Sequence, residues 1–561
     1  MIQGALRRLW KLPERRCRSQ IETEWIRMRD GVRLATVHVW PIDADGETPT
    51  VLVRTPYSVN KGRSAMGMAG RLLAESGYHV VLQDVRGRYE SEGHFEPFLH
   101  EREDGLDTLE WIERQGWHQG RIGLFGASYV AYTAWSLLAE APGRIDSIVS
   151  AIGSHRLYNV FYGRGGGLAL RNAFEWGLTV GTQNSIPERE IDLERGLRYR
   201  PVHQGDRVAL HEVAWLREWV KRNRKDDYWN RVDLPLPESL PPTLLMAGWY
   251  DFFLQTQLED YARLCEIAAR TQDPAPRMVI GPWCHGLPAR WGWWRHEMGG
   301  SMLRQSIRHF DRTLKHAESA ASQPNVKYFS AGDDTWQSSR TWPPSTTSAC
   351  EFHLRSQNGR GRLETQPASA EEEALSFTHD PEAPHATLGG PLFGGKAGIK
   401  DQRKATRTTK NHIAYTSEPL TSDLKLAGGS QLDLTFSTDA QDADVFAQLI
   451  EVLPNGREEN ITDILQRLRW YGVPAEEDEP RFTEPGQRQK LSLQFTHTAR
   501  RVARGSRLKL VIAGSDFPTY DRNPGTTAWP GLAEVEDFKV ACHSLHHGLA
   551  HAPRLTLSLR D

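Results

Sequence analysis

The segment GASY (126–129) has the residue types and spacing that best fit covalent chemistry. It follows the apolar run 121–125, which predicts a buried strand, and it precedes a helical stretch. A serine at such a strand–turn–helix elbow can act as a nucleophile, because the next backbone N–H lies at a helix N-terminus and can stabilise an oxyanion. Val130 breaks the usual G-x-S-x-G pattern, so a purely structural Ser128 in a tight turn is the alternative.

A nucleophilic serine needs a general base and an acid that orients the base. Asp251 directly follows the strand-like run 243–250, and His285 directly follows the run 277–284. Because the carboxyl ends of parallel strands meet at one edge of a sheet, we expect both side chains to approach Ser128. The alternatives are a loop acid that caps a helix and a half-buried structural histidine.

The elements that must position these residues alternate between strands and helices. Helical spacing covers 101–115, with apolar residues on one side and charges on the other. Buried strands are predicted at 51–54, 79–83, 121–125, 147–151, 243–249 and 277–283. Strands interleaved with helices predict an α/β fold, in which a mostly parallel sheet is covered on both faces.

Two other zones differ from this pattern. Residues 153–241 lack buried-strand signals and hold a glycine cluster at 165–167 with amphipathic, Trp-containing stretches, which predicts an inserted helical cap. Residues 326–561 show short alternating runs separated by turn residues, which is typical of an all-β sandwich or jelly-roll. We therefore assign 1–152 and 242–325 to the two parts of the α/β domain.

Composition excludes several classes of protein. The 561 residues carry a net charge of −2, which argues against a protein built mainly to bind nucleic acid or an anionic membrane. The run 122–139 is uncharged, but its pattern changes from strand to turn to helix, so we expect it in a folded core and not in a bilayer. The five cysteines form no CxxC pair, and the N-terminus lacks an apolar signal segment, so we expect a cytoplasmic protein.

Seven ordered segments give the chain a family resemblance. It resembles the CocE/NonD hydrolases, which include bacterial cocaine esterase, α-amino acid ester hydrolases and X-Pro dipeptidyl-peptidases. The matching segments are MRDGVRLAT (28–36), RTPY (54–57), QDVRGRYESEG (83–93), GASY (126–129), GWYD (248–251), GPWCH (281–285) and GSDFPTYDRNPGT (514–526). The resemblance implies an α/β-hydrolase domain with an inserted helical cap and a C-terminal jelly-roll domain.

The resemblance also implies roles for individual residues. Ser128 would be the nucleophile, His285 the general base and Asp251 the residue that holds the imidazole. The oxyanion hole would consist of the Tyr57 hydroxyl and the Tyr129 backbone N–H.

One residue of the elbow departs from the family pattern. The glycine that the family places three residues after the serine is Ala131 here. Its extra methyl group is expected either to be absorbed by a small shift or to crowd the elbow.

The cap provides candidates for substrate contact. Phe161 and Trp176 lie in segments that resemble the family's acyl-binding region, and packing between cap and core is the alternative for both. Asp251 is followed by Phe252 and Phe253 and not by acids, so we expect an apolar or aromatic acyl pocket. The histidines between 543 and 551 are interpreted as a strand edge and not as a metal site.

The expected activity is that of a serine hydrolase that cleaves a carboxylic ester, or alternatively an amide, through an acyl-enzyme. An X-Pro dipeptidyl-peptidase or amide acylase is the second hypothesis. An inactive scaffold with a ligand-binding jelly-roll is the third. The expected partner is a small-molecule ester or amide, with no nucleic acid, membrane, cofactor or metal. The sequence leaves open whether the chain forms a homo-oligomer.

Overall fold

The architecture follows from a computed structural model of the chain. It describes residues 2–44, 46–59, 64–163, 165–182, 190–290, 293, 298–316, 324–345, 347–408, 411–474 and 479–560.

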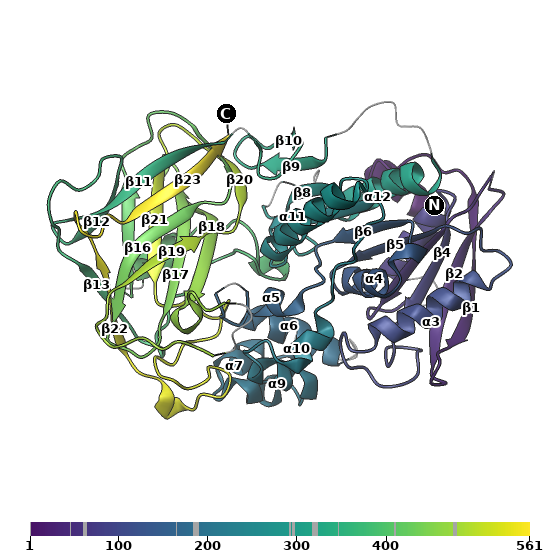
Figure 1. The fold of residues 1–561 in the computed structure, drawn as a ribbon, viewed down its shortest axis with the longest axis horizontal. Helices are drawn as coiled ribbons and strands as arrows, with labels where there is room; N and C mark the ends of the chain where they lie inside the picture. The colour runs from purple at the N-terminus through teal and green to yellow at the C-terminus, as the bar shows by residue number, and fades with distance from the viewer. Residues whose placement is uncertain are drawn as a thin grey trace.

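The α/β domain is built on a mostly parallel sheet, as the alternating pattern predicts (Figure 1). The strand order is β1-β2-β4-β3-β5-β6-β7-β8-β9-β10, with parallel pairing from β4 to β9. The strands are β1 (Arg18–Arg27), β2 (Arg33–Ile42), β3 (Thr50–Thr55), β4 (His79–Asp84), β5 (Ile122–Ala127), β6 (Ser147–Ala151), β7 (Thr243–Tyr250), β8 (Arg277–Cys284), β9 (Val326–Ser330) and β10 (Thr335–Ser339). Every residue of β3, β4 and β7 is buried, which explains why the middle of each strand is an apolar run without alternation.

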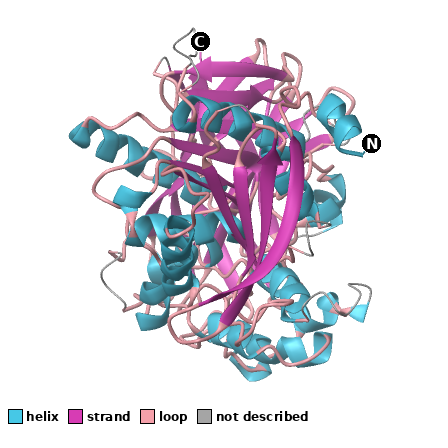
Figure 2. Cartoon of the chain, turned by 90° about the vertical axis from the view of Figure 1, so that its right-hand side faces the viewer, coloured by secondary structure: helices cyan, strands magenta, loops and turns pink. Residues whose placement is uncertain are grey.

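Helices cover both faces of this sheet (Figure 2). Helices α2 (Ala65–Ala74) and α12 (Met298–Leu314) share one hydrophobic core. Helices α3 (Glu101–Glu113), α4 (Tyr129–Glu140) and α11 (Leu254–Thr271) share the core on the other side. The short helix α1 (Ile2–Leu9) contacts α2.

The cap is the chain between β6 and β7, and in Figure 1 it lies between the α/β domain and the β-rich part. Its helices are α5 (Leu157–Phe161), α6 (Leu170–Gly181), α7 (Leu193–Arg198), α8 (Gly205–Ala209), α9 (Ala214–Lys221) and α10 (Asp227–Val232). Trp219 and Trp229 are fully buried and join the same core as α4 and α11. The predicted helical insertion is therefore present.

The C-terminal part is mostly β, with the short helix α13 (Arg403–Thr408) and three 3₁₀ turns, and its described residues form thirteen strands around a separate hydrophobic core. We call it the β-domain. Its strands are β11 (Thr347–Gln357), β12 (Arg360–Glu364), β13 (Leu375–His379), β14 (His412–Ser417), β15 (Leu424–Gly428), β16 (Gln431–Thr438), β17 (Asp444–Val452), β18 (Glu458–Arg467), β19 (Gln489–Gln494), β20 (Thr498–Val502), β21 (Arg507–Ala513), β22 (Ala541–His546) and β23 (Arg554–Arg560).

The uncharged run 122–139 consists of β5 and most of α4 inside the α/β domain. Among the described helices, none is long and apolar enough to cross a membrane.

Candidate active site

Ser128 lies at a strained turn between β5 and α4. Its backbone angles are φ 58° and ψ −126°, a conformation that residues with a side chain rarely adopt. Gly126 makes the turn possible, because a Cβ atom there would lie 2.0 Å from the Val130 carbonyl oxygen. Gly126 is therefore required by the close approach of two backbone segments. The turn places Ser128 just beyond the carboxyl end of β5.

Three side chains that are far apart in the sequence meet at this turn. His285 Nε2 lies 3.0 Å from Ser128 Oγ, and His285 Nδ1 lies 2.9 Å from Asp251 Oδ2. Asp251 follows β7 and His285 follows β8, so the carboxyl ends of two adjacent parallel strands deliver both groups. This is the hydrogen-bond order that lets an imidazole take the serine proton while a carboxylate fixes its tautomer.

The Asp251 carboxylate is held on both oxygens. Oδ2 faces His285, and Oδ1 accepts a 2.8 Å hydrogen bond from the Phe253 backbone N–H. Its side chain is fully buried. A buried carboxylate with two donors keeps a fixed orientation, and it can stabilise the imidazolium that forms when His285 takes a proton.

Two hydrogen-bond donors lie beside Ser128, the Tyr57 hydroxyl and the Tyr129 backbone N–H. Tyr57 follows β3, and its hydroxyl interacts with the Ser128 side chain. Burial raises the pKa of Tyr57, so the phenol keeps its proton at neutral pH. Tyr129 is the first residue of α4, and its backbone N–H is among the first-turn donors that have no partner within a helix.

The Tyr57 hydroxyl is itself oriented from the cap. Trp176, on α6, donates its indole N–H to the Tyr57 oxygen over 3.0 Å. Because that bond occupies one lone pair of the phenol oxygen, the phenol proton is directed elsewhere, and Ser128 is its other neighbour. The sequence predicts Trp176 only as a pocket wall, and this hydrogen bond is an additional feature of the structure.

Aromatic side chains surround Ser128 in a pocket with an empty volume of about 390 Å³. We call it the aromatic pocket. Besides Ser128, its lining consists of Phe98, Tyr129, Tyr132, Leu157, Phe161, Asn172, Trp176, Phe252, Phe253 and Phe393. Both predicted substrate-contact residues, Phe161 and Trp176, thus lie in the same pocket wall as Ser128.

Five residues of the aromatic pocket are not identified by sequence reasoning: Phe98, Tyr132, Leu157, Asn172 and Phe393. Phe98 has a positive φ of 73° and stacks on Tyr129, with ring centroids 4.4 Å apart. Phe393 comes from the loop after β13, and its ring centroid lies 4.8 Å from that of His285. The β-domain thereby contributes directly to the surroundings of His285.

The methyl group of Ala131 is accommodated by a glycine on a neighbouring segment. Ala131 is fully buried, and a Cβ atom on Gly153 would lie 2.5 Å from the Ala131 Cβ and 2.9 Å from the Ser128 carbonyl oxygen. The absence of a side chain at Gly153 therefore provides the room that Ala131 needs. The nucleophile turn therefore accommodates Ala131 at the position where the family has a glycine.

The segment QDVRGRYESEG (83–93) contacts the loop that carries Tyr57. Asp84 Oδ1 accepts a 2.8 Å hydrogen bond from the Val59 backbone N–H, which fixes the loop that carries Tyr57. Burial raises the pKa of Asp84 to about 7. Arg86 pairs with Asp104 and not with Asp84.

The histidines near the C-terminus bond to hydroxyl groups. His543 bonds to Thr438, His546 to Ser437 and His547 to Tyr415. In the described part of the chain, no group of three His, Cys, Asp or Glu side chains could hold a metal ion.

Comparisons with known proteins cover nearly the whole chain. Residues 30–287 match the X-Pro dipeptidyl-peptidase (S15 family) model, and residues 319–556 match the X-Pro dipeptidyl-peptidase C-terminal non-catalytic domain. The cocaine esterase of a Rhodococcus species is 29% identical, over 95% of this chain and 97% of that protein.

Solved structures share the architecture. An aminopeptidase from a marine sediment archaeon superposes with a TM-score of 0.81 at 21% identity, over 98% of both chains. An α-amino acid ester hydrolase superposes with a TM-score of 0.80 at 22% identity, again over 98% of both chains.

Proposed function

Because the chain belongs to the CocE/NonD family of serine hydrolases, we propose that Ser128, His285 and Asp251 are its catalytic triad. The chain is a serine hydrolase of carboxylic esters. The observation that carries the residue assignment is the continuous set of hydrogen bonds from Asp251 through His285 to Ser128, at 2.9 and 3.0 Å.

The proposed reaction is acyl transfer through a covalent intermediate. Ser128 Oγ attacks the ester carbonyl carbon while His285 Nε2 takes the hydroxyl proton. The carbonyl oxygen becomes an oxyanion that accepts from the Tyr57 hydroxyl and the Tyr129 backbone N–H. The tetrahedral intermediate collapses, His285 gives the proton to the leaving alkoxide, and the alcohol departs. Water activated by His285 then hydrolyses the acyl-enzyme and restores Ser128.

The aromatic pocket favours an uncharged acyl group. Every residue of its described lining is apolar, aromatic, an amide or Ser128 itself, so a charged acyl group would lose its hydration without a counter-charge. A flat aryl or short branched acyl group would instead replace water against Phe252 and Trp176. We therefore propose aryl or small apolar carboxylic esters as the substrate class.

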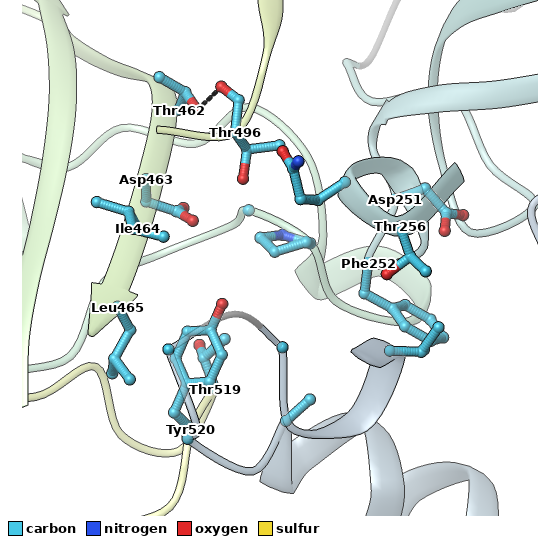
Figure 3. Close-up of a pocket in the computed structure, with 18 of the residues that line it drawn as sticks. Asp251, Phe252, Thr256, Thr462, Asp463, Ile464, Leu465, Thr496, Thr519 and Tyr520 are labelled. Atoms are coloured by element: carbon cyan, nitrogen blue, oxygen red, sulfur yellow. Dashed lines mark hydrogen bonds between the residues drawn. The ribbon is translucent and has the colours of Figure 1, made fainter. Parts of the chain in front are cut away.

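A peptidase activity is the second candidate. Cleavage after an N-terminal Xaa-Pro requires an acid near Ser128 to bind the free amine, and none of the described residues that line the aromatic pocket carries a carboxylate. The adjoining cavity (Figure 3), which shares Phe161 and Phe252 with the aromatic pocket, does hold acids, so comparison of Xaa-Pro anilides with phenyl esters decides between the two activities. An inactive scaffold is disfavoured because the three triad groups lie within hydrogen-bonding distance.

The experiment pairs active-site labelling with turnover. We expect wild-type protein to react with a fluorophosphonate probe and to hydrolyse p-nitrophenyl and phenyl esters. Both properties should be lost together in Ser128→Ala, with an unchanged thermal unfolding midpoint as the folding control. A labelled enzyme that prefers Xaa-Pro anilides would move the assignment to the peptidase. A folded wild type that neither labels nor turns over an ester would refute the proposal.

We also propose a cytoplasmic location and a small-molecule ester as the only partner needed for activity. All five cysteines are free, which is typical of a reducing compartment. Cell fractionation tests the location, and activity of the purified protein without added metal, cofactor or second protein tests the partner.

A further inference from the structure

A fully buried cation, Arg88, lies beside the candidate active site. It belongs to the turn that follows β4, and β4 is the parallel neighbour of β3, the strand that leads to Tyr57. Burying a guanidinium removes it from water, so its N–H groups must find acceptors within the protein. The acceptors that Arg88 uses show which segments it holds together.

Two backbone carbonyls from different parts of the molecule accept hydrogen bonds from Arg88. Its Nε donates to the Pro56 carbonyl over 3.0 Å, and its Nη1 donates to the Val180 carbonyl over 2.7 Å. Pro56 directly precedes Tyr57, and Val180 lies in α6, one turn beyond Trp176. A cation is favourable there, because the last carbonyls of a helix lack partners within the helix and carry partial negative charge.

The Arg88 side chain is itself held in place. Its guanidinium carbon lies 4.9 Å from the centre of the Phe95 ring and 5.1 Å from that of Tyr89. The turn that carries it is tight, because a Cβ atom on Gly87 would lie 2.1 Å from the Phe95 backbone nitrogen. The Arg88 backbone N–H also donates to the Val85 carbonyl over 3.1 Å. Arg88 is therefore a rigid connection between the Tyr57 loop and α6.

The charge of Arg88 also acts on the Tyr57 phenol. Burial raises the pKa of Tyr57, and the positive charge of Arg88 acts in the opposite direction. A nearby cation strengthens the phenol O–H as a donor and stabilises negative charge that develops on an oxygen in front of it. Arg88 is not among the described residues that line the aromatic pocket, so it acts on a substrate only through Tyr57 and α6.

We propose that Arg88 is a positioning residue of the oxyanion hole, which holds the Tyr57 loop against α6 and thereby maintains the hydrogen bond between Trp176 and Tyr57. The inference rests on the proposed esterase function of Ser128 and on Tyr57 as an oxyanion donor. A planar guanidinium suits this role, because its N–H groups point in fixed directions and can set the spacing of two carbonyls. Since Arg88 acts through Tyr57, its loss cannot cost more than loss of the phenol hydroxyl, about 10²–10³-fold in rate.

The test uses phenyl trifluoromethyl ketone, a reversible inhibitor that mimics the tetrahedral intermediate. Ser128 Oγ adds to the ketone carbon, the carbonyl electron pair moves to the oxygen, and His285 takes the serine proton. The adduct therefore places a stable oxyanion beside Tyr57. Affinity for this ketone and kcat for phenyl acetate are measured on full-length protein, with the thermal unfolding midpoint as the folding control.

Two substitutions separate the charge of Arg88 from its two hydrogen bonds. Arg88→Lys keeps the charge but has a single donor nitrogen, and Arg88→Met keeps the length but loses charge and donors. We expect ketone affinity and kcat to fall together in Arg88→Lys, by about 3- to 30-fold, and further in Arg88→Met, within the limit set by the phenol. In the Tyr57→Phe background neither substitution should lower them further, because no hydroxyl remains to be positioned.

Arg7→Lys is the matched control, since Arg7 on α1 is also buried and donates to two backbone carbonyls, those of Pro13 and Leu72, each over 2.7 Å. It should leave ketone affinity and kcat unchanged. Equal losses in the Tyr57 and Tyr57→Phe backgrounds, or the same loss in Arg7→Lys, would show a general structural effect and overturn the inference.

The same experiment distinguishes failure of the inference from failure of the proposed function. A wild type that binds the ketone with an affinity that neither Arg88 substitution changes refutes the role of Arg88 alone. A folded wild type that neither binds the ketone nor hydrolyses the ester refutes the esterase proposal, and the role of Arg88 with it. Should Arg88→Met fail to fold, the comparison of Arg88→Lys in the two backgrounds still decides the matter.

Discussion

The hydrogen bond from Trp176 to Tyr57 predicts that a cap residue controls the oxyanion hole. Trp176→Phe keeps an aromatic ring in the pocket wall but removes the indole N–H that lies 3.0 Å from the Tyr57 oxygen. One such hydrogen bond contributes about 0.5–1.5 kcal/mol. If that energy orients the phenol in the transition state, kcat should fall about 2- to 10-fold. Tyr57→Phe removes the donor itself and should lower kcat about 10²–10³-fold.

A double-mutant cycle distinguishes orientation from packing. In the Tyr57→Phe background there is no hydroxyl left to orient, so Trp176→Phe should have no further effect on kcat. The effect of Trp176→Phe on KM should persist in this background, because residue 176 still lines the aromatic pocket. The assay is steady-state hydrolysis of a phenyl ester by the four proteins. Trp215→Phe is the control, since Trp215 packs against Trp176 at 5.5 Å between ring centroids but does not bond to Tyr57. Equal losses of kcat from Trp176→Phe in both backgrounds would refute the reasoning.

Three further predictions concern the elbow, Asp463 of β18 and the proposed triad. Gly153→Ala should cost about 1–3 kcal/mol of stability through overpacking and should slow fluorophosphonate labelling. Adding Ala131→Gly should recover part of both losses, because it removes the collision between the two Cβ atoms but leaves the contact with the Ser128 carbonyl oxygen. Burial raises the pKa of Asp463 to about 7, which means that wild-type stability declines as pH rises from about 4 to 7, so Asp463→Asn should stabilise the protein by at most about 4 kcal/mol above pH 7. Urea unfolding of the two proteins should show no difference near pH 4. A difference in unfolding free energy that stays constant across this pH range would contradict the assignment. Asp251→Asn should lower kcat by about 10⁴ because His285 loses its tautomer control, and a loss below tenfold in a stopped ester assay would count against the triad.

The strands that deliver Asp251 and His285 of the proposed triad could be predicted because each is buried on both faces. Such strands appear in the sequence as short apolar runs, and the predicted runs 243–249 and 277–283 correspond to β7 and β8. The residues that follow these strands must then lie at the edge of the sheet where Ser128 lies. Local sequence and the direction of parallel strands are enough for this inference.

The remaining features depend on contacts between distant segments. Phe393 reaches His285 from a polar loop more than one hundred residues away, and no local pattern specifies which loop covers the site. Trp176 has the composition of any cap aromatic, and only three-dimensional placement shows that its N–H meets Tyr57. In the sequence, Asp463 is an ordinary polar residue of a strand, and only the three-dimensional structure shows that it lines a cavity together with residues of the cap.

The β-domain also fixes the cap that carries Trp176. A Cβ atom on Gly165 would lie 1.8 Å from the Leu465 carbonyl oxygen, and the Gly165 carbonyl accepts a 2.8 Å hydrogen bond from the Arg467 backbone N–H. The glycine cluster at 165–167 thus lets the cap backbone meet β18 directly. Helix α6 follows this contact and places Trp176 against Tyr57. The orientation of Tyr57, the proposed oxyanion donor, therefore depends on all three parts of the molecule. Weakening the contact between the cap and β18 should lower kcat even though no residue near the reacting atoms is changed.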